Sequence, residues 1–187
     1  MGLKKLMLVI VSFLAVSAHA EMKNEQTILG GLLARGGVMK QKPLSNTDLV
    51  NLCERGFTKA YTLYGGANRT IECSRGTIEY SGSKDFRSPA DMNRILENIH
   101  AGLTSKEKTY VHCNNGAHAS GFVAAIALRT FCGISADRAV SYWDRTLNGY
   151  PLQEPNRSNL MKRIRAYSVR ADLELSEGQK QSFGCPN

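Results

Sequence analysis

The sequence predicts an α/β domain with a small, mostly parallel central sheet flanked by helices. Three observations lead to this expectation. Helix-type and strand-type patterns alternate between residues 45 and 113, and only helical patterns follow. A well-delimited amphipathic helix occupies the middle of the chain. A short apolar strand then runs through a glycine-containing loop into a buried helix, an arrangement that favours anion binding.

The first 20 residues have the features of a secretory signal peptide. Lys4 and Lys5 precede an apolar run from Leu6 to Val16, and Ala18-His19-Ala20 has the pattern of a cleavage site. The run is shorter than the roughly 20 residues of a membrane-spanning helix, so we expect cleavage after Ala20 rather than a retained anchor. Removing 20 of the 187 residues leaves 167, enough for one domain, and lowers the net charge from +8 to +6.

A positive charge of this size favours anionic partners. We expect a phosphorylated or other anionic ligand, with a protein partner as the alternative. The chain has no dense Lys/Arg run and no zinc-finger spacing, so we expect no nucleic acid, no metal, no cofactor and, after signal cleavage, no membrane association. The expected divisions are a signal peptide (1–20), an N-terminal segment (21–44), the main domain (45–173) and a polar tail (174–187).

The first part of the mature chain is expected to contain one helix and three strands. Residues 21–44 lack a clear period and are interpreted as loop, with a short strand around Leu32 and Leu33. The stretch after them predicts a helix capped by Asn46 or Thr47 and closed by Gly56. Aromatic and β-branched residues predict strands over 57–64 and 76–82.

The second part is expected to be mainly helical. Ser88 and Pro89 begin a helix whose apolar residues share one face, and Gly102 is expected to end it. Those apolar residues are Met92, Ile95, Leu96 and Ile99. The remaining elements are expected to be a strand over 108–113, a buried helix over about 120–131, a helix capped by Ser135 and a helix over 156–170.

Five cysteines follow the predicted cleavage site: Cys53, Cys73, Cys113, Cys132 and Cys185. An exported chain can form disulfides, and an odd count leaves one thiol unpaired in a monomer. Cys113 is the natural free thiol because its loop requires a thiolate. We expect the pairs Cys53–Cys73 and Cys132–Cys185, although the residue pattern alone leaves the pairing open. We also expect the tail to be poorly ordered unless Cys185 holds it.

The stretch VHCNNGAHASG, residues 111–121, contains the residues that we expect to bind an anion and to provide a nucleophile. A loop between a strand and a helix N-terminus directs several backbone N–H groups to one point, and the helix dipole adds positive potential there. The same field favours the thiolate of Cys113, which could attack phosphorus. The expected anion-binding positions are His112, Asn114, Asn115, Gly116, Ala117, Ala119 and Gly121.

This stretch resembles the signature of the protein tyrosine phosphatase superfamily, in particular the small dual-specificity phosphatases. That signature is His-Cys, five residues, Arg, Ser or Thr, and often Gly, and here only the arginine is missing, replaced by Ala119. The resemblance covers roughly residues 45–170 and implies the phosphatase fold. It implies that Cys113 is the nucleophile and that Ser120 assists its departure. The family's general acid would correspond to Asp85, with Asp91 as the second candidate.

Because of Ala119, ordinary phosphatase turnover is the least supported of the properties that the resemblance implies. The family's arginine grips two phosphoryl oxygens, and alanine has neither charge nor donors. We therefore expect a periplasmic or secreted phosphatase-like protein with little or no turnover, a pseudophosphatase that binds a phosphate ester, another anion or a protein.

Two alternatives stay open. One is an active cysteine-dependent phosphoric monoester hydrolase in which His118 supplies a partial cation. The other is a rhodanese-like sulfurtransferase, whose shorter loop would fit the spacing Cys-x-x-Gly-x-His. Asp85, His118 and Ser120 also have structural interpretations, as an exposed loop acid, a supporting histidine and a helix cap.

Overall fold

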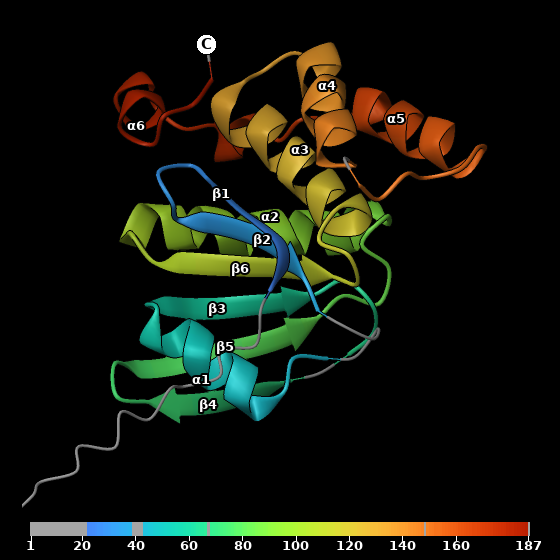
Figure 1. The fold of residues 1–187 in the computed structure, drawn as a ribbon. Helices are drawn as coiled ribbons and strands as arrows, with labels where there is room; N and C mark the ends of the chain where they lie inside the picture. Colours follow the sequence, from blue (N-terminus) through green and yellow to red (C-terminus); the bar gives the residue numbers. More distant parts are fainter. Residues whose placement is uncertain (1–21, 39–42, 67, 148, 187) are drawn as a thin grey trace, which may run out of the picture.

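The computed structural model describes residues 22–38, 43–66, 68–147 and 149–186, and the predicted signal peptide lies outside these ranges. The described residues contain one six-stranded sheet with the order β1-β2-β6-β3-β5-β4 (Figure 1). The strands are β1 (Lys23–Ile28), β2 (Leu33–Gly37), β3 (Phe57–Thr62), β4 (Arg69–Cys73), β5 (Gly76–Gly82) and β6 (Lys108–Cys113).

The sheet is parallel at its centre and antiparallel at both edges. Strands β2, β6, β3 and β5 pair in parallel, whereas β1 and β4 add to the edges as antiparallel partners of β2 and β5. Strand β6 lies at the centre and is buried from Thr109 to Cys113, as expected for a parallel strand that is covered on both faces. The mostly parallel central sheet predicted from the sequence is therefore confirmed.

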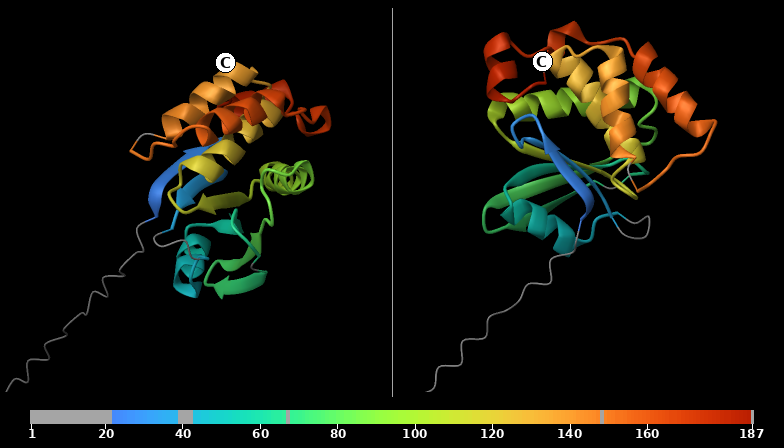
Figure 2. Two further views of the ribbon diagram at one scale, coloured as in Figure 1. Left: turned by 90° about the vertical axis from the view of Figure 1, so that its right-hand side faces the viewer. Right: turned by 45° about the horizontal axis from the view of Figure 1, so that its top comes forward.

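Helices cover the sheet on both faces (Figure 2). The helices are α1 (Asn46–Glu54), α2 (Pro89–Ser105), α3 (His118–Cys132), α4 (Ala136–Thr146), α5 (Asn156–Ala166) and α6 (Glu177–Ser182). Leu49 and Leu52 of α1 pack into one apolar cluster with Ala60, Ile78 and Tyr110 of the sheet. Helices α2, α3 and α4 form a larger cluster with the opposite face. Tyr110 of β6 belongs to the first cluster, whereas Val111 and Cys113 belong to the larger one, so Cys113 points to the face that α2, α3 and α4 cover.

Several helix ends differ from the expected positions. The N-cap of α1 is Ser45, not Asn46 or Thr47, because Ser45 and Asp48 form a reciprocal capping box. Ser88 caps α2 as predicted, but Gly102 does not end this helix. A Cβ at Gly102 would lie 3.1 Å from the Thr109 hydroxyl, so this glycine permits close packing of α2 on β6. Helix α5 ends at Ala166, short of the predicted residue 170.

The interpretation of residues 21–44 as mainly loop was wrong, because both β1 and β2 lie in this segment. The short strand expected around Leu32 and Leu33 corresponds to the start of β2. Strand β4 was also missed. The two missed edge strands are short and polar. Strand β1 shows no clean alternation of exposure, and β4 alternates only between exposed and partly exposed residues, with no buried position. Strand β2 has the sequence LARGG, in which two glycines suggest a loop although all five residues are buried.

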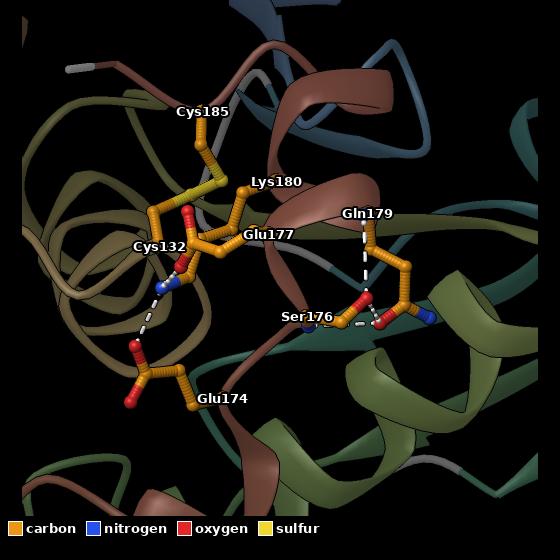
Figure 3. Close-up of polar contacts among 7 residues, drawn as sticks. All are labelled: Cys132, Glu174, Ser176, Glu177, Gln179, Lys180 and Cys185. Atoms are coloured by element: carbon orange, nitrogen blue, oxygen red, sulfur yellow. Dashed lines mark hydrogen bonds and ion pairs between the residues drawn. A yellow bond between two sulfur atoms is a disulfide. The ribbon is translucent and has the colours of Figure 1, made fainter.

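Both predicted disulfides are present, and Cys113 is free and buried. Cys53–Cys73 joins α1 to β4, and Cys132–Cys185 joins the end of α3 to the C-terminal tail. Lys180 lies beside this second disulfide and pairs with Glu174 and Glu177 (Figure 3). The two ion pairs measure 2.6 and 2.7 Å. The tail is thus held by Cys185, as the sequence suggested. Among the described residues, no helix is both long enough and apolar enough to cross a membrane.

Candidate functional site

Cys113 is the last residue of β6, and the loop that follows it leads directly into α3 at His118. Its side chain is 2% exposed, and its Sγ lies 3.3 Å from the Ser120 hydroxyl. Ala117 precedes α3 without a capping side chain, so the first amides of this helix have no side-chain acceptor at that position. The loop therefore combines a buried thiol with the N-terminus of a 15-residue helix.

Ser120 lies within the first turn of α3, because the helix begins at His118 and not near Ser120 as predicted. Its hydroxyl faces Cys113 and does not cap the helix. The role that the resemblance implies for Ser120, assistance to a departing thiolate, stays a prediction. Asn114 and Asn115 are partly exposed at the turn, whereas Gly116 and Ala117 are buried beneath it.

Strand β2 packs directly against the loop from one side. A Cβ at Gly37 would lie 2.4 Å from the Gly116 nitrogen, and a Cβ at Gly116 would lie 2.6 Å from the Gly37 nitrogen. Gly116 also has a φ of +69°, a conformation that favours glycine. The backbone N–H of Val38 donates to the Cys113 carbonyl at 3.1 Å. The loop backbone thus has no room for additional side chains on this side.

Helix α4 holds the other side of the loop. The indole of Trp143 donates to the His118 carbonyl at 3.0 Å, and the Thr146 hydroxyl donates to the Ala117 carbonyl at 3.0 Å. Gly121 is required at this contact, because its Cβ would lie 2.3 Å from the Thr146 hydroxyl oxygen. In the Ser-Gly pair at the end of the motif, Ser120 therefore faces Cys113, and Gly121 allows the close approach of α4.

A cavity of about 780 Å³ opens beside the loop and brings together three of the predicted site residues: Asp85, His118 and Ala119. Apolar residues, among them Leu63, Tyr64 and Phe86, form part of its wall. Its positively charged lining residues are Lys84, Arg87, Lys162 and Arg163, and among the described residues only Asp85 gives the lining a carboxylate. Sequence reasoning missed these four cations, because they come from the loop before α2 and from α5, which are about 75 positions apart.

Comparison with family models and with curated proteins finds no sequence match. Comparison with solved structures finds similar folds. TpbA of P. aeruginosa aligns with a TM-score of 0.52 and 12% identity, covering 81% of this chain and 86% of TpbA. The active form of Tk-PTP aligns with a TM-score of 0.51 and 16% identity, covering 76% and 97%. Human DUSP28 aligns with a TM-score of 0.50 and 13% identity, covering 73% and 90%.

The chain has the dual-specificity phosphatase fold. The resemblance inferred from the Cys113 loop is confirmed at the level of fold, at sequence identities too low to carry an activity. Within this fold, Ala119 is 1% exposed and its methyl group forms part of the cavity wall. No side chain longer than a methyl group enters the cavity from the position at which the phosphatase signature has arginine.

Asp85 lies on the cavity wall but is engaged with Arg87. Its Oδ1 accepts from the Arg87 backbone at 3.1 Å and from the Arg87 guanidinium at 3.0 Å. These hydrogen bonds lower the pKa of Asp85, so the carboxyl group is ionised at neutral pH. Asp85 would have to leave Arg87 and gain a proton before it could act as the general acid of a phosphatase fold.

Asp91, the second candidate acid, stabilises the loop that carries Asp85. Its Oδ2 accepts from the Asp85 backbone N–H at 2.9 Å and from the Ser83 hydroxyl at 2.7 Å. These hydrogen bonds, that of Asp85 first, lower its pKa. The contacts of Asp91 fit a structural role better than a catalytic one.

His118 lines the cavity, and its Nε2 lies 2.7 Å from the Tyr150 carbonyl. Because a carbonyl only accepts, Nε2 carries a proton and donates it. This bond fixes the orientation of the ring at the start of α3. A role of His118 as a replacement cation stays a prediction, since it requires Nδ1 to be protonated as well.

His112 is buried behind the loop between Tyr80 and Tyr110, whose rings stack with its imidazole. Its Nε2 is 2.8 Å from the Tyr80 hydroxyl, which also accepts from the Leu44 backbone N–H. Tyr80 can therefore donate its own proton to His112. Burial lowers the pKa of His112 to about 4, so the ring is neutral at physiological pH and supports the loop as an uncharged group.

This lowered pKa predicts a loss of stability in mild acid. The unfolded chain binds a proton at His112 below about pH 6.5, whereas the folded chain does so only near pH 4. Neutral His112 thus makes its full contribution to the free energy of unfolding above pH 6.5. This contribution, about 3 kcal/mol, is lost as the pH falls toward 4. Urea unfolding between pH 7 and pH 4, followed by the fluorescence of the single, fully buried Trp143, measures it.

The variant His112→Gln is the control for this experiment, since glutamine does not titrate. Its free energy of unfolding should change less with pH over the same interval. The lowered pKa values of Asp85 and Asp91 begin to affect stability at about pH 5, but they do so equally in both proteins. The difference between the two pH profiles therefore reports on His112. Equal pH dependence of the two proteins would contradict the neutral, buried state of His112.

Proposed function

We propose that this protein is an exported pseudophosphatase that binds a phosphate ester or a related tetrahedral anion in the Cys113 loop with little or no turnover. The observation that carries the proposal is Ala119, which leaves a buried methyl group where a phosphatase needs a bidentate cation. The retained strand–loop–helix arrangement supports binding, since backbone amides and the helix dipole act without that arginine.

The charge around the cavity supports an anionic ligand. Lys84 and Arg87 lie on one wall, Lys162 and Arg163 on another, and only Asp85 opposes them among the described lining residues. The Arg163 guanidinium donates to the Arg87 carbonyl at 3.3 Å, so the two walls meet at this point. A ligand phosphate would thus enter through a region of positive potential.

The proposal of export rests on the predicted signal peptide and is supported by the two disulfides, which persist in oxidising compartments. The location would be the periplasm or the cell exterior. A protein partner that carries the phosphate group is compatible with the same site.

An active cysteine-dependent phosphatase is the second candidate function. The observation in its favour is the geometry of Cys113, which is free and within 3.3 Å of the Ser120 hydroxyl. A domain with no chemistry has less need of this nucleophile. In this alternative, Asp85 would serve as the acid and His118 as the partial cation.

The test combines an anion-binding measurement with a turnover assay. Calorimetry with inorganic tungstate and phosphate should show binding by the purified protein, and 4-nitrophenyl phosphate should be hydrolysed slowly or not at all. Cys113-dependent turnover at ordinary phosphatase rates, absent in Cys113→Ser, would support the second candidate instead. Sulfur transfer from thiosulfate to cyanide would support the rhodanese-like alternative, and absence of oxyanion binding would refute the proposal.

A further inference from the structure

Arg35 is a buried arginine directly behind the Cys113 loop. It lies in the middle of β2 and is 1% exposed. Its Nη1 donates to the Gly116 carbonyl, its Nη2 to the Gln26 side-chain oxygen, and its Nε to the Tyr142 hydroxyl at 3.3 Å. The guanidinium thus connects β1, α4 and the centre of the loop.

All three hydrogen-bond partners of Arg35 are neutral. Among the residues that the structure describes, no carboxylate forms an ion pair with it. An arginine keeps its charge in proteins, and a buried charge without a counter-charge is costly. An anion bound in the loop would supply the missing counter-charge.

The loop backbone connects this charge to the expected anion position. The Gly116 carbonyl accepts from Arg35 and also lies 3.4 Å from the Asn24 amide nitrogen. Two donors on one carbonyl polarise its peptide group, which makes the adjoining N–H of Ala117 a stronger donor. Ala117 directly precedes α3, where the helix dipole acts in the same direction.

The geometry of β2 keeps the guanidinium at this place. Gly37 pairs with Cys113 in the sheet, and Gly36 pairs with His112, so Arg35 pairs with Val111 just before the loop. The backbones of Gly37 and Gly116 are in close contact, and the Val38 N–H bond to the Cys113 carbonyl holds the start of the loop against β2. Arg35 is therefore fixed relative to the loop amides by the sheet itself.

We propose that Arg35 is a positioning residue of the anion site, which supplies from behind the loop part of the positive potential that Ala119 does not supply within it. The inference rests on the proposed binding of an oxyanion by the Cys113 loop. It assigns to Arg35 an effect on ligand affinity, beyond its stabilisation of the fold. It also selects for ligands with two negative charges over ligands with one.

The sharpest variant is Gln26→Glu. It keeps an oxygen acceptor for the Arg35 guanidinium but places a negative charge against it. The three hydrogen bonds of Arg35, which clamp the loop to β1 and α4, would remain, while the positive charge of Arg35 would be neutralised. The second variant, Arg35→Met, removes the charge and the clamp together. The probes are tungstate and perrhenate, two tetrahedral oxyanions of similar size that carry two and one negative charges.

Calorimetry should show that Gln26→Glu and Arg35→Met bind tungstate about 10- to 100-fold more weakly than the unaltered protein. Because a Coulomb energy scales with the charge of the ligand, the loss for perrhenate should be about half as large on a logarithmic scale. Arg35→Lys, which keeps the charge, should retain most of the tungstate preference even if it lowers the melting temperature.

Arg129→Met is the matched control. Arg129 donates to backbone carbonyls at the end of α5, including that of Tyr167 at 3.2 Å, far along α3 from the loop. This variant should lose stability but keep its tungstate affinity.

The outcomes separate the two proposals. If the unaltered protein binds neither oxyanion, the proposed function fails. If it binds tungstate and Gln26→Glu binds it equally well, only the role of Arg35 is overturned. Equal losses for tungstate and perrhenate would likewise reduce Arg35 to a structural clamp. If Arg35→Met does not fold, Gln26→Glu and Arg35→Lys still decide the question.

Discussion

Ala119→Arg is expected to increase Cys113-dependent hydrolysis of 4-nitrophenyl phosphate by a factor of about 10² to 10⁴. Loss of a comparable transition-state stabiliser costs this much in other enzymes, and restoring it should recover a similar part. The methyl group of Ala119 already forms part of the wall of the 780 Å³ cavity, so a longer side chain can extend into it from the first turn of α3. Initial rates of nitrophenol release measure the effect.

The choice of substrate isolates the arginine from the general acid. Nitrophenolate is a good leaving group and needs no proton, so the engagement of Asp85 with Arg87 should not limit this reaction. Ala119→Lys adds the charge without the planar fork and should recover less activity. Addition of Cys113→Ser should abolish the gain. A folded Ala119→Arg protein that binds tungstate but shows no gain would mean that the missing arginine is not what limits turnover.

The parts of the fold that could be predicted are those with strong local patterns. Helix α2 has a capping serine, a proline at its first position and one apolar face, and the structure confirms each of them. Helix α3 was recognised because it is buried on most sides and is thus largely apolar. Strand β6 was recognised as a short segment that leads directly into the Cys113 loop. The C-terminal end of α2, near Gly102, and the start of α3, at His118, differ by a few residues from the predicted ends, because tertiary contacts determine them.

The missed strands depend on contacts that leave no local pattern. Strand β1 is polar, with three partly exposed residues at its start, and exists as the antiparallel partner of β2. The glycines of β2 suggest a loop, yet Gly36 is required because its Cβ would lie 2.0 Å from the Tyr110 hydroxyl oxygen. In both cases a neighbouring strand determines the conformation. For β1 it is β2, the next strand along the chain, and for β2 it is also the distant β6.

The candidate site shows the same division. The family resemblance implied that Ser120 acts beside Cys113, and the structure places the two side chains in contact within one strand–loop–helix unit. The arrangement of Arg35 could not be predicted, since it contacts Gly116 across 81 positions and belongs to a segment interpreted as loop. Its only sequence signal is an arginine directly before two glycines, which is weak without knowledge of the sheet order.

The Cys132–Cys185 disulfide is expected to contribute about 4 kcal/mol to the free energy of unfolding. It closes a loop of 53 residues, and the chain-entropy model gives a contribution of this size for such a loop. The double variant Cys132→Ala/Cys185→Ser removes both thiols and so avoids mispairing with Cys113. Urea unfolding monitored by Trp143 fluorescence measures the loss, and hydrogen exchange reports on the tail separately.

The structure predicts which contacts of the tail should survive. Leu175 is buried, and its backbone N–H donates to the Phe131 carbonyl at 3.0 Å, so the tail should remain docked up to this residue. Beyond it, α6 buries no residue, and its ion pairs of Lys180 with Glu174 and Glu177 are local to the tail. Apart from the disulfide, the partly buried Phe183 packs this segment against the core. Exchange should therefore accelerate from residue 176 onward while the Cys113 loop stays protected.

The matched variant Cys53→Ala/Cys73→Ser opens a loop of 20 residues and should cost about 3 kcal/mol without affecting the tail. A loss below about 1 kcal/mol for the first variant would show that the tail is held by packing and not by its disulfide.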